Sequence, residues 1–150
     1  MIRSIRTNSS NQDFRNLVKK LDADLAIRDG DEHDFYDQFN KIDKLKYVVV
    51  LYNDETAVAC GAIKEYEAGV MEIKRMFVLP RERNKGYASL ILRELEKWAW
   101  ELGYKKCILE TGVKQIEAVG LYHRNNYSRI ANYPPYDKME NSLCFQKLLF

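Results

Sequence analysis

The fold is decided by Val70-Met-Glu-Ile-Lys-Arg-Met-Phe-Val78 and by Leu79-Pro-Arg-Glu-Arg-Asn-Lys-Gly-Tyr-Ala88, which follows it directly. The first stretch predicts a strand, and the apolar period then becomes helical from Asn84 to Leu102. Gly103 is typical of the residue that follows a helix end, and Tyr104–Glu110 predicts a second strand. A strand, a helix and a strand in this order favour a parallel, right-handed unit. The side chains expected on the core face of the helix are Ile91, Leu95, Trp98 and Leu102.

The segments on both sides of this unit predict an α/β fold with a mixed sheet. Two strands before Val70 are expected to join it in an antiparallel meander, because their connections are too short for crossovers. The N-terminal part predicts a strand, an amphipathic helix that starts with an S-x-x-D pattern at Ser10, and a short helix over Phe35–Asn40. The remaining expected elements are the strands Ile2–Arg6, Tyr47–Tyr52, Thr56–Tyr66, Tyr127–Ala131 and Ser142–Leu149, and the helix Gln115–Asn125.

Composition limits the classes of protein that the chain can represent. It has 150 residues, and 24 Lys and Arg stand against 22 Asp and Glu. No linker-like stretch interrupts it, so we expect one domain over residues 1–150. The net charge of +2 argues against a large basic face for nucleic acid. No apolar run approaches the roughly 18 residues of a membrane span, and the N-terminus lacks the core of a signal peptide. We therefore expect a cytoplasmic protein with no membrane partner.

Cysteine and histidine usage indicates neither disulfides nor a metal site. Cys60, Cys107 and Cys144 lie in apolar runs and form no CxxC pair, which predicts three buried, reduced thiols. Neither His33 nor His123 has a partner at metal-ligand spacing, so we expect no metal.

The segment Arg83-Asn-Lys-Gly-Tyr-Ala88 has the chemistry of a phosphate site at a helix start. A helix N-terminus presents unpaired N–H groups and a partial positive charge. Gly86 lets an oxygen approach the backbone closely, and Ala88 keeps the next turn clear. The pattern is neither a P-loop nor a dinucleotide-binding fingerprint, because the glycines that those motifs need are missing.

The order of motifs along the chain is similar to that of one known family. It runs E-I-K-R-M-F-V-L-P, R-x-x-G-x-A, a helix ending W-A-x-x-L-G-Y, L-E-T-G, and A-x-x-L-Y-x-x-x-x-Y. This order resembles the GNAT superfamily of acetyl-CoA-dependent N-acetyltransferases, most densely from Met71 to Tyr127. An ending S-x-C-F-x-K-x-L from Ser142 fits a bacterial branch of small, single-domain members. The resemblance implies a mostly antiparallel sheet of six or seven strands, with a central splayed parallel pair and about four helices.

The resemblance also implies where acetyl-CoA binds. Backbone N–H groups at the helix start would hold the pyrophosphate, and the end of the preceding strand would pair with the pantetheine amides. Gln115 stands where the family has an Asn that contacts pantetheine, so the residue departs from the pattern but keeps the amide. The residues implied in cofactor binding are Met76, Phe77, Val78, Arg83, Asn84, Lys85, Gly86, Tyr87, Ala88, Ser89 and Gln115.

Three residues carry the chemistry that the resemblance implies. Tyr122 matches the tyrosine that protonates the departing thiolate. Glu72 matches a glutamate that serves as general base, which the reaction needs because an amine of pKa about 10 must lose a proton before it attacks. Strand alternation predicts one shared face for Glu72, Lys74, Met76 and Val78. Glu110, in L-E-T-G, is the rival base and a candidate contact for the substrate.

The expected reaction is direct attack of a primary amine on acetyl-CoA in a ternary complex. The acceptor would be a small molecule or a peptide, and the acidic segment from Asp22 to Asp37 is either a solvated loop or an acidic lip that favours a cationic amine. Two other functions stay open: a non-catalytic acyl-CoA sensor, and another CoA- or phosphate-dependent transferase on a similar scaffold. A homodimer in which the final strand pairs across the interface is compatible with the resemblance.

Overall fold

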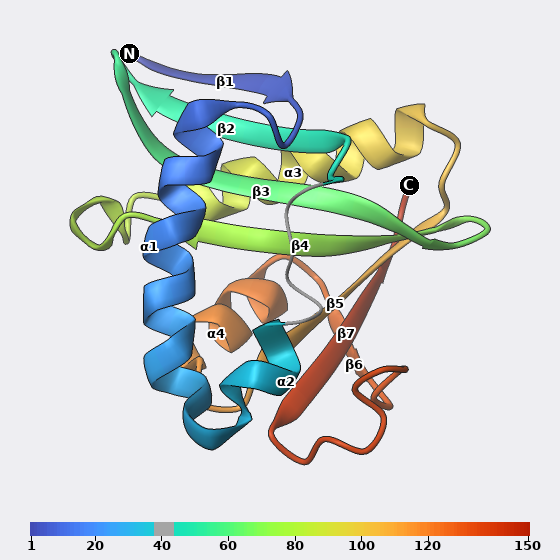
Figure 1. Ribbon diagram of the computed structural model, residues 1–150. Helices are drawn as coiled ribbons and strands as arrows, with labels where there is room; N and C mark the ends of the chain where they lie inside the picture. The colour runs from blue at the N-terminus through green and yellow to red at the C-terminus, as the bar shows by residue number, and fades with distance from the viewer. Residues whose placement is uncertain (38–43) are drawn as a thin grey trace.

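Seven strands form one sheet, in the order β1-β2-β3-β4-β5-β7-β6, in the computed structural model, which describes residues 1–37 and 44–150 (Figure 1). The strands are β1 (Ile2–Thr7), β2 (Tyr47–Asn53), β3 (Thr56–Glu67), β4 (Val70–Val78), β5 (Lys106–Gly112), β6 (Ser128–Ile130) and β7 (Ser142–Leu148). The helices are α1 (Gln12–Asp29), α2 (His33–Asp37), α3 (Tyr87–Glu101) and α4 (Ile116–Arg124), with 3-10 turns at Gly30–Glu32 and Pro80–Glu82. All the predicted strands are present within two residues of their expected ends, so the α/β class and the mixed sheet are confirmed.

The helix α1 crosses one face of the sheet, and α3 covers the other (Figure 1). The buried stripe of α1 is Phe14, Leu17, Val18 and Leu21. The predicted helix start at Ser10 is wrong. Asn11 is the cap, because its side-chain oxygen accepts the N–H of Phe14 at 2.9 Å, whereas the Ser10 hydroxyl donates to Asn8 at 2.6 Å.

The short helix expected over Phe35–Asn40 corresponds to α2. Residues 38–40 of that range lie outside the described part of the chain. Among the described residues, no helix is both long enough and apolar enough to cross a membrane. The three cysteines are buried and free, as predicted.

The helix α3 begins three residues later than the sequence predicts. Asn84 and Gly86 have φ of 65° and 82°, and a right-handed helix cannot continue through such a conformation. Ile91 and Leu95 are buried as expected, but Leu102 is 40% exposed because the helix has ended at Glu101. The prediction that Leu102 lies on the core face of the helix is therefore wrong.

The parallel pair β4–β5 is splayed, which confirms the central feature of the expected fold. The two strands pair at only three positions, from Val70 opposite Lys106 to Glu72 opposite Ile108. Beyond Glu72 the backbone of β4 has no partner on β5, while β5 remains paired with β7 up to Gly112. The sheet therefore opens between β4 and β5 toward their carboxyl ends.

A bulge in β4 changes which side chains face which side of the sheet. Arg75 has φ of 58°, and the register with β3 shifts where Gly61 opposes both Arg75 and Met76. A Cβ on Gly61 would lie 2.6 Å from the Met76 sulfur and 2.6 Å from Ile91 of α3, so Met76 points toward α3. Lys74 instead contacts Tyr136 on the opposite face. The prediction of one shared face for Glu72, Lys74, Met76 and Val78 is therefore wrong, because the extra residue reverses the alternation.

Candidate active site at the splay

A groove of about 530 Å³ runs from the start of α3 along the end of β4 that has no partner on β5. We call it the splay groove. It is also walled by α4 and by the side of α1 that carries Leu21 and Asp24. Ten of the eleven residues predicted to bind the cofactor line it, namely Met76, Phe77, Val78, Arg83, Asn84, Gly86, Tyr87, Ala88, Ser89 and Gln115. Lys85 does not.

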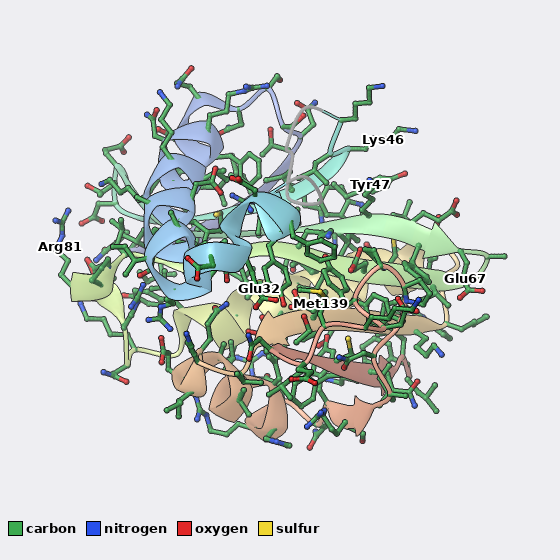
Figure 2. The ribbon with its side chains drawn as sticks, turned by 60° about the horizontal axis from the view of Figure 1, so that its bottom comes forward. Glu32, Lys46, Tyr47, Glu67, Arg81 and Met139 are labelled. Carbon is green, nitrogen blue, oxygen red and sulfur yellow. The ribbon has the colours of Figure 1, made fainter. Side chains whose placement is uncertain are left out.

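The basic residues before α3 differ in where their charge lies. The Lys85 ammonium pairs with Glu82 at 2.7 Å. Arg83 donates from Nε to the Val78 carbonyl at 2.9 Å, and its guanidinium lies 5.7 Å from the centre of the Phe77 ring. Arg81 projects from the outer end of the sheet (Figure 2). Arg83 is thus the one of these three that lines the splay groove.

The start of α3 supplies unpaired N–H groups to the groove. The first intrahelical bond from this end is donated by Leu90 to the Gly86 carbonyl. The N–H groups of Tyr87, Ala88 and Ser89 precede it in the helix and have no intrahelical acceptor. Gly86, which has a left-handed conformation, and these three residues all line the groove.

A smaller cavity of about 80 Å³ lies on the α1 and α2 side of the splay. We call it the inner cavity. Its wall includes the carboxyl groups of Asp29, Glu72 and Glu110, the phenols of Tyr36 and Tyr136, and Lys74. Four residues line both this cavity and the splay groove: Leu21, Met76, Gln115 and Tyr122. Tyr122 therefore stands at the junction of the two spaces.

The position of Tyr122 is fixed by packing of its ring. The ring lies 5.7 Å from that of Tyr127 and 6.1 Å from that of Phe145, measured between centroids, and the side chain is buried. Burial raises the pKa of Tyr122 above its ordinary value, so the hydroxyl keeps its proton. Within the described residues, this hydroxyl donates no hydrogen bond. The proton is therefore available at the junction.

The two candidate bases have different surroundings. The Glu72 carboxylate accepts a hydrogen bond from Tyr133 at 2.7 Å and lies 3.4 Å from the Lys74 ammonium. Glu110 accepts one from Ser142 at 2.8 Å. Burial raises the pKa of Glu110 to about 7, while Ser142 and Lys74 act in the opposite direction. A carboxyl with this pKa takes up and releases protons near neutral pH.

Three residues at the site were missed in the sequence. Tyr36 of α2 and Ser142 of β7 are hydrogen-bonded to each other at 2.7 Å, next to Glu110. Asn125, after α4, donates to the Ser89 hydroxyl at 3.0 Å. No local pattern indicates them, because their partners lie 106, 32 and 36 residues away along the chain.

The acidic segment that begins at Asp22 is more than a solvated loop. Asp22 accepts a hydrogen bond from the buried Arg75, and Asp24 lies 3.3 Å from Arg28. Asp29 lines the inner cavity. Among the described residues, no group of three or more His, Cys, Asp and Glu side chains could hold a metal ion; the expected absence of a metal stays a prediction.

Comparison with known proteins identifies the family. The profile described as "Acetyltransferase (GNAT) family" matches residues 13–127, which include both strands of the splay and all of α3 and α4. The chain belongs to the GNAT acetyltransferase family. A protein of Azospirillum brasilense named IAA acetyltransferase is 36% identical over 95 residues, which cover 63% of this chain and 62% of the relative. The match thus spans less than two thirds of that relative.

Two solved structures of N-acyltransferases share the fold. An acyl-CoA N-acyltransferase structure from Klebsiella pneumoniae has a TM-score of 0.84 at 26% identity and covers 100% of this chain and 99% of its own. The PaiA N-acetyltransferase of Thermoplasma acidophilum, solved with coenzyme A, has a TM-score of 0.74 at 13% identity and covers 99% of each chain. These likenesses confirm the GNAT fold predicted from the sequence.

Proposed function

We propose that this chain transfers the acetyl group of acetyl-CoA to a primary amine of a small molecule or peptide. The observation that carries the proposal is the position of Tyr122, whose protonated hydroxyl stands where the splay groove meets the inner cavity. A group-transfer enzyme needs its two substrates to meet at such a junction, with a proton donor beside the bond that breaks.

The splay groove fits coenzyme A in chemistry. Its unpaired N–H groups at Tyr87, Ala88 and Ser89 suit a pyrophosphate, and Arg83 adds a positive charge. The backbone of β4 after Glu72 has lost its β5 partner, and strand-like groups of this kind suit the amides of pantetheine. When bound, acetyl-CoA supplies the thioester carbonyl that an amine attacks. Curated and solved relatives named as acetyltransferases, one of them holding coenzyme A, support this assignment.

Each turnover removes two protons from an ammonium acceptor, and two side chains account for them. We assign the first to Glu110 as general base, in preference to Glu72, because Tyr133 and Lys74 already engage the Glu72 carboxylate. The second proton reaches the departing thiolate from Tyr122, which regains it from the attacking nitrogen. The electron pair of the nitrogen forms the amide bond, and the pair of the C–S bond leaves with sulfur.

The test is release of free thiol from acetyl-CoA against a panel of amino acids, peptides, polyamines, aminoglycosides and simple monoamines, with CoA binding measured by calorimetry. We expect saturable release with at least one class of primary amine. A chain that binds CoA but releases thiol with none of them would contradict the proposal and indicate an acyl-CoA sensor. A chain that does not bind CoA would contradict the assignment of the splay groove.

A further inference from the structure

The acetyl transfer proposed above releases one net proton, and Glu110 has to lose that proton before the next turnover. An ammonium acceptor gives up two protons, and the thiolate takes only one of them. The remaining proton sits on the Glu110 carboxyl, at the wall of a cavity that the acceptor itself fills. Direct return of the proton to water through that cavity must wait until the product has left.

Glu110 is the first of three side-chain oxygen atoms that are linked in a row by hydrogen bonds. Ser142 Oγ lies 2.8 Å from Glu110 Oε2, and Tyr36 Oη lies 2.7 Å from Ser142 Oγ. Tyr36 and Ser142 are 6% and 2% exposed, so bulk water does not compete for these bonds. A serine hydroxyl has one hydrogen, so when Ser142 donates to Glu110, Tyr36 donates to Ser142.

The outer end of this chain lies beside a second small space. Tyr36 lines the inner cavity and also an outer cavity of about 20 Å³, whose wall includes Glu32, Val113 and Asn141. Glu32 lies in the turn that leads into α2 (Figure 2) and accepts a hydrogen bond from Asn141 at 2.6 Å. The phenol therefore connects the side of Glu110 away from the splay groove with a polar opening.

We propose that Ser142 and Tyr36 form a proton relay that carries the proton from Glu110 to water in the outer cavity while the inner cavity is occupied. The inference rests on the proposed acetyl transfer and adds the route of its released proton. Glu110 passes its proton to Ser142 Oγ, the Ser142 hydrogen moves to Tyr36 Oη, and the Tyr36 hydrogen moves to water. Three O–H bonds break and three form, and one hydronium ion leaves. No oxidant or further reactant is needed.

The directions of the hydrogen bonds agree with this order of proton transfers. After the transfer, Tyr36 donates to Ser142 and Ser142 donates to the ionised Glu110, which is the arrangement described above. Burial raises the pKa of Tyr36 to about 12, so the phenol passes a proton by exchange and does not ionise. The charged groups that act on Glu110 are Lys74 and Glu72 of β4 and Asp29 of α1.

The deciding variant is Tyr36→Phe, which removes the outer hydroxyl and keeps the ring that contacts Phe35 and Tyr136. Thiol release and proton release are recorded together, in dilute buffer with a pH indicator. We expect the two signals to coincide in the wild type. In Tyr36→Phe we expect turnover to fall about tenfold, and proton release to lag behind the first turnover of thiol.

The matched control is Tyr66→Phe, since Tyr66 belongs to the same aromatic cluster but donates to the Pro134 carbonyl. It should behave as the wild type. Ser142→Ala, which breaks the chain one step closer to Glu110, should show the same lag. Unchanged turnover in Tyr36→Phe, or a loss of turnover in which proton release still coincides with thiol release, would overturn the relay. A wild-type chain that binds CoA and releases no thiol would overturn the proposed function itself, and the relay with it.

Discussion

Tyr122 is the side chain whose removal should separate chemistry from binding. Tyr122→Phe keeps the ring contacts with Tyr127 and Phe145 and removes only the hydroxyl at the junction. We expect kcat to fall by about 10²-fold or more, with little change in the Kd for CoA, because general acid catalysis contributes factors of about that size. Steady-state kinetics and calorimetry on one preparation measure both. Unchanged turnover would exclude Tyr122 as the acid.

Glu110 and Glu72 can be distinguished by the pH dependence of kcat/KM. With Glu110 as base, kcat/KM falls as the pH decreases through about 7, because the carboxyl then becomes protonated and cannot accept the proton from the amine. Glu110→Gln should remove this limb of the profile. Glu72→Gln is the matched control and should keep it. A limb that disappears only in Glu72→Gln would return the role of base to Glu72.

Glu110 should also make the free energy of unfolding depend on pH, in a direction that its pKa defines. Its pKa is about 7 in the folded chain and 4.5 ordinarily, so the folded state binds more protons than the unfolded state between these values. The free energy of unfolding therefore decreases as the pH rises from 4.5 to about 7. Glu110→Gln should remove this penalty and stabilise the chain above pH 7 by at most about 3 kcal/mol. Urea denaturation at acidic and alkaline pH tests this, and an equal gain at both would contradict it.

At the scale of elements, one side chain connects the start of α3 with the end of α4. The Asn125 side-chain nitrogen donates to the Leu121 carbonyl at 2.9 Å and to Ser89 Oγ at 3.0 Å. Because a carbonyl can only accept a hydrogen bond, the Asn125 atom that contacts Leu121 is the side-chain nitrogen. The same nitrogen donates to Ser89, so Ser89 is the acceptor in that bond. The Ser89 hydrogen therefore remains available for a phosphate oxygen. Asn125 thus couples the start of α3, where we propose that the pyrophosphate binds, to the helix that carries Tyr122.

This link predicts non-additive losses of CoA affinity. Asn125→Ala and Ser89→Ala should each weaken CoA binding about fivefold, the worth of roughly one hydrogen bond. The double variant should lose little more than either single one, because both remove the same interaction. Pantetheine, which lacks the pyrophosphate, is the control ligand and should bind all of them equally. If the double variant loses as much CoA binding free energy as the two single variants together, the coupling is contradicted.

At the scale of the whole molecule, the splay leaves two half-sheets joined by few backbone bonds. The strands β1 to β4 meet β5, β7 and β6 at only three residue pairs. An ion pair with a buried carboxylate crosses this division. Glu96 of α3, which packs on the first half, is 2% exposed and accepts from Lys147 of β7 at 2.8 Å and from Tyr127 at 2.8 Å. The helix α3 thus joins the two half-sheets through Glu96, and the groove between them stays open.

Removing the cation of this pair should destabilise the whole fold. Lys147→Met leaves the Glu96 carboxylate buried without its cation, and we expect a loss of about 3 kcal/mol in the free energy of unfolding. The control is the double variant Glu96→Gln and Lys147→Met, which leaves no buried charge and should lose less. Urea denaturation measures both. A double variant that is less stable than Lys147→Met would contradict this account.

The sequence alone predicted the parts of the site that belong to one continuous segment. The strand β4, the turn with Gly86 and the start of α3 follow each other in the chain, and local conformational preference acts over that distance. Nine of the ten cofactor-binding residues that the resemblance implies in this segment line the splay groove, and Gln115, which lies outside the segment, lines it too. The helix start was misplaced because Asn84 adopts a positive φ, which hydrophobic periodicity does not reveal.

Tertiary structure decided everything that depends on two distant segments. The bulge at Arg75 reverses the strand alternation, and it is defined only by the pairing of β4 with β3. The choice between Glu72 and Glu110 depends on partners from β7 and the segment after β6, since Ser142 and Tyr133 reach them only in the folded chain. The pKa of Glu110 likewise follows from its burial. Sequence determines local conformation and the available side-chain chemistry; the environment that tunes that chemistry exists only after folding.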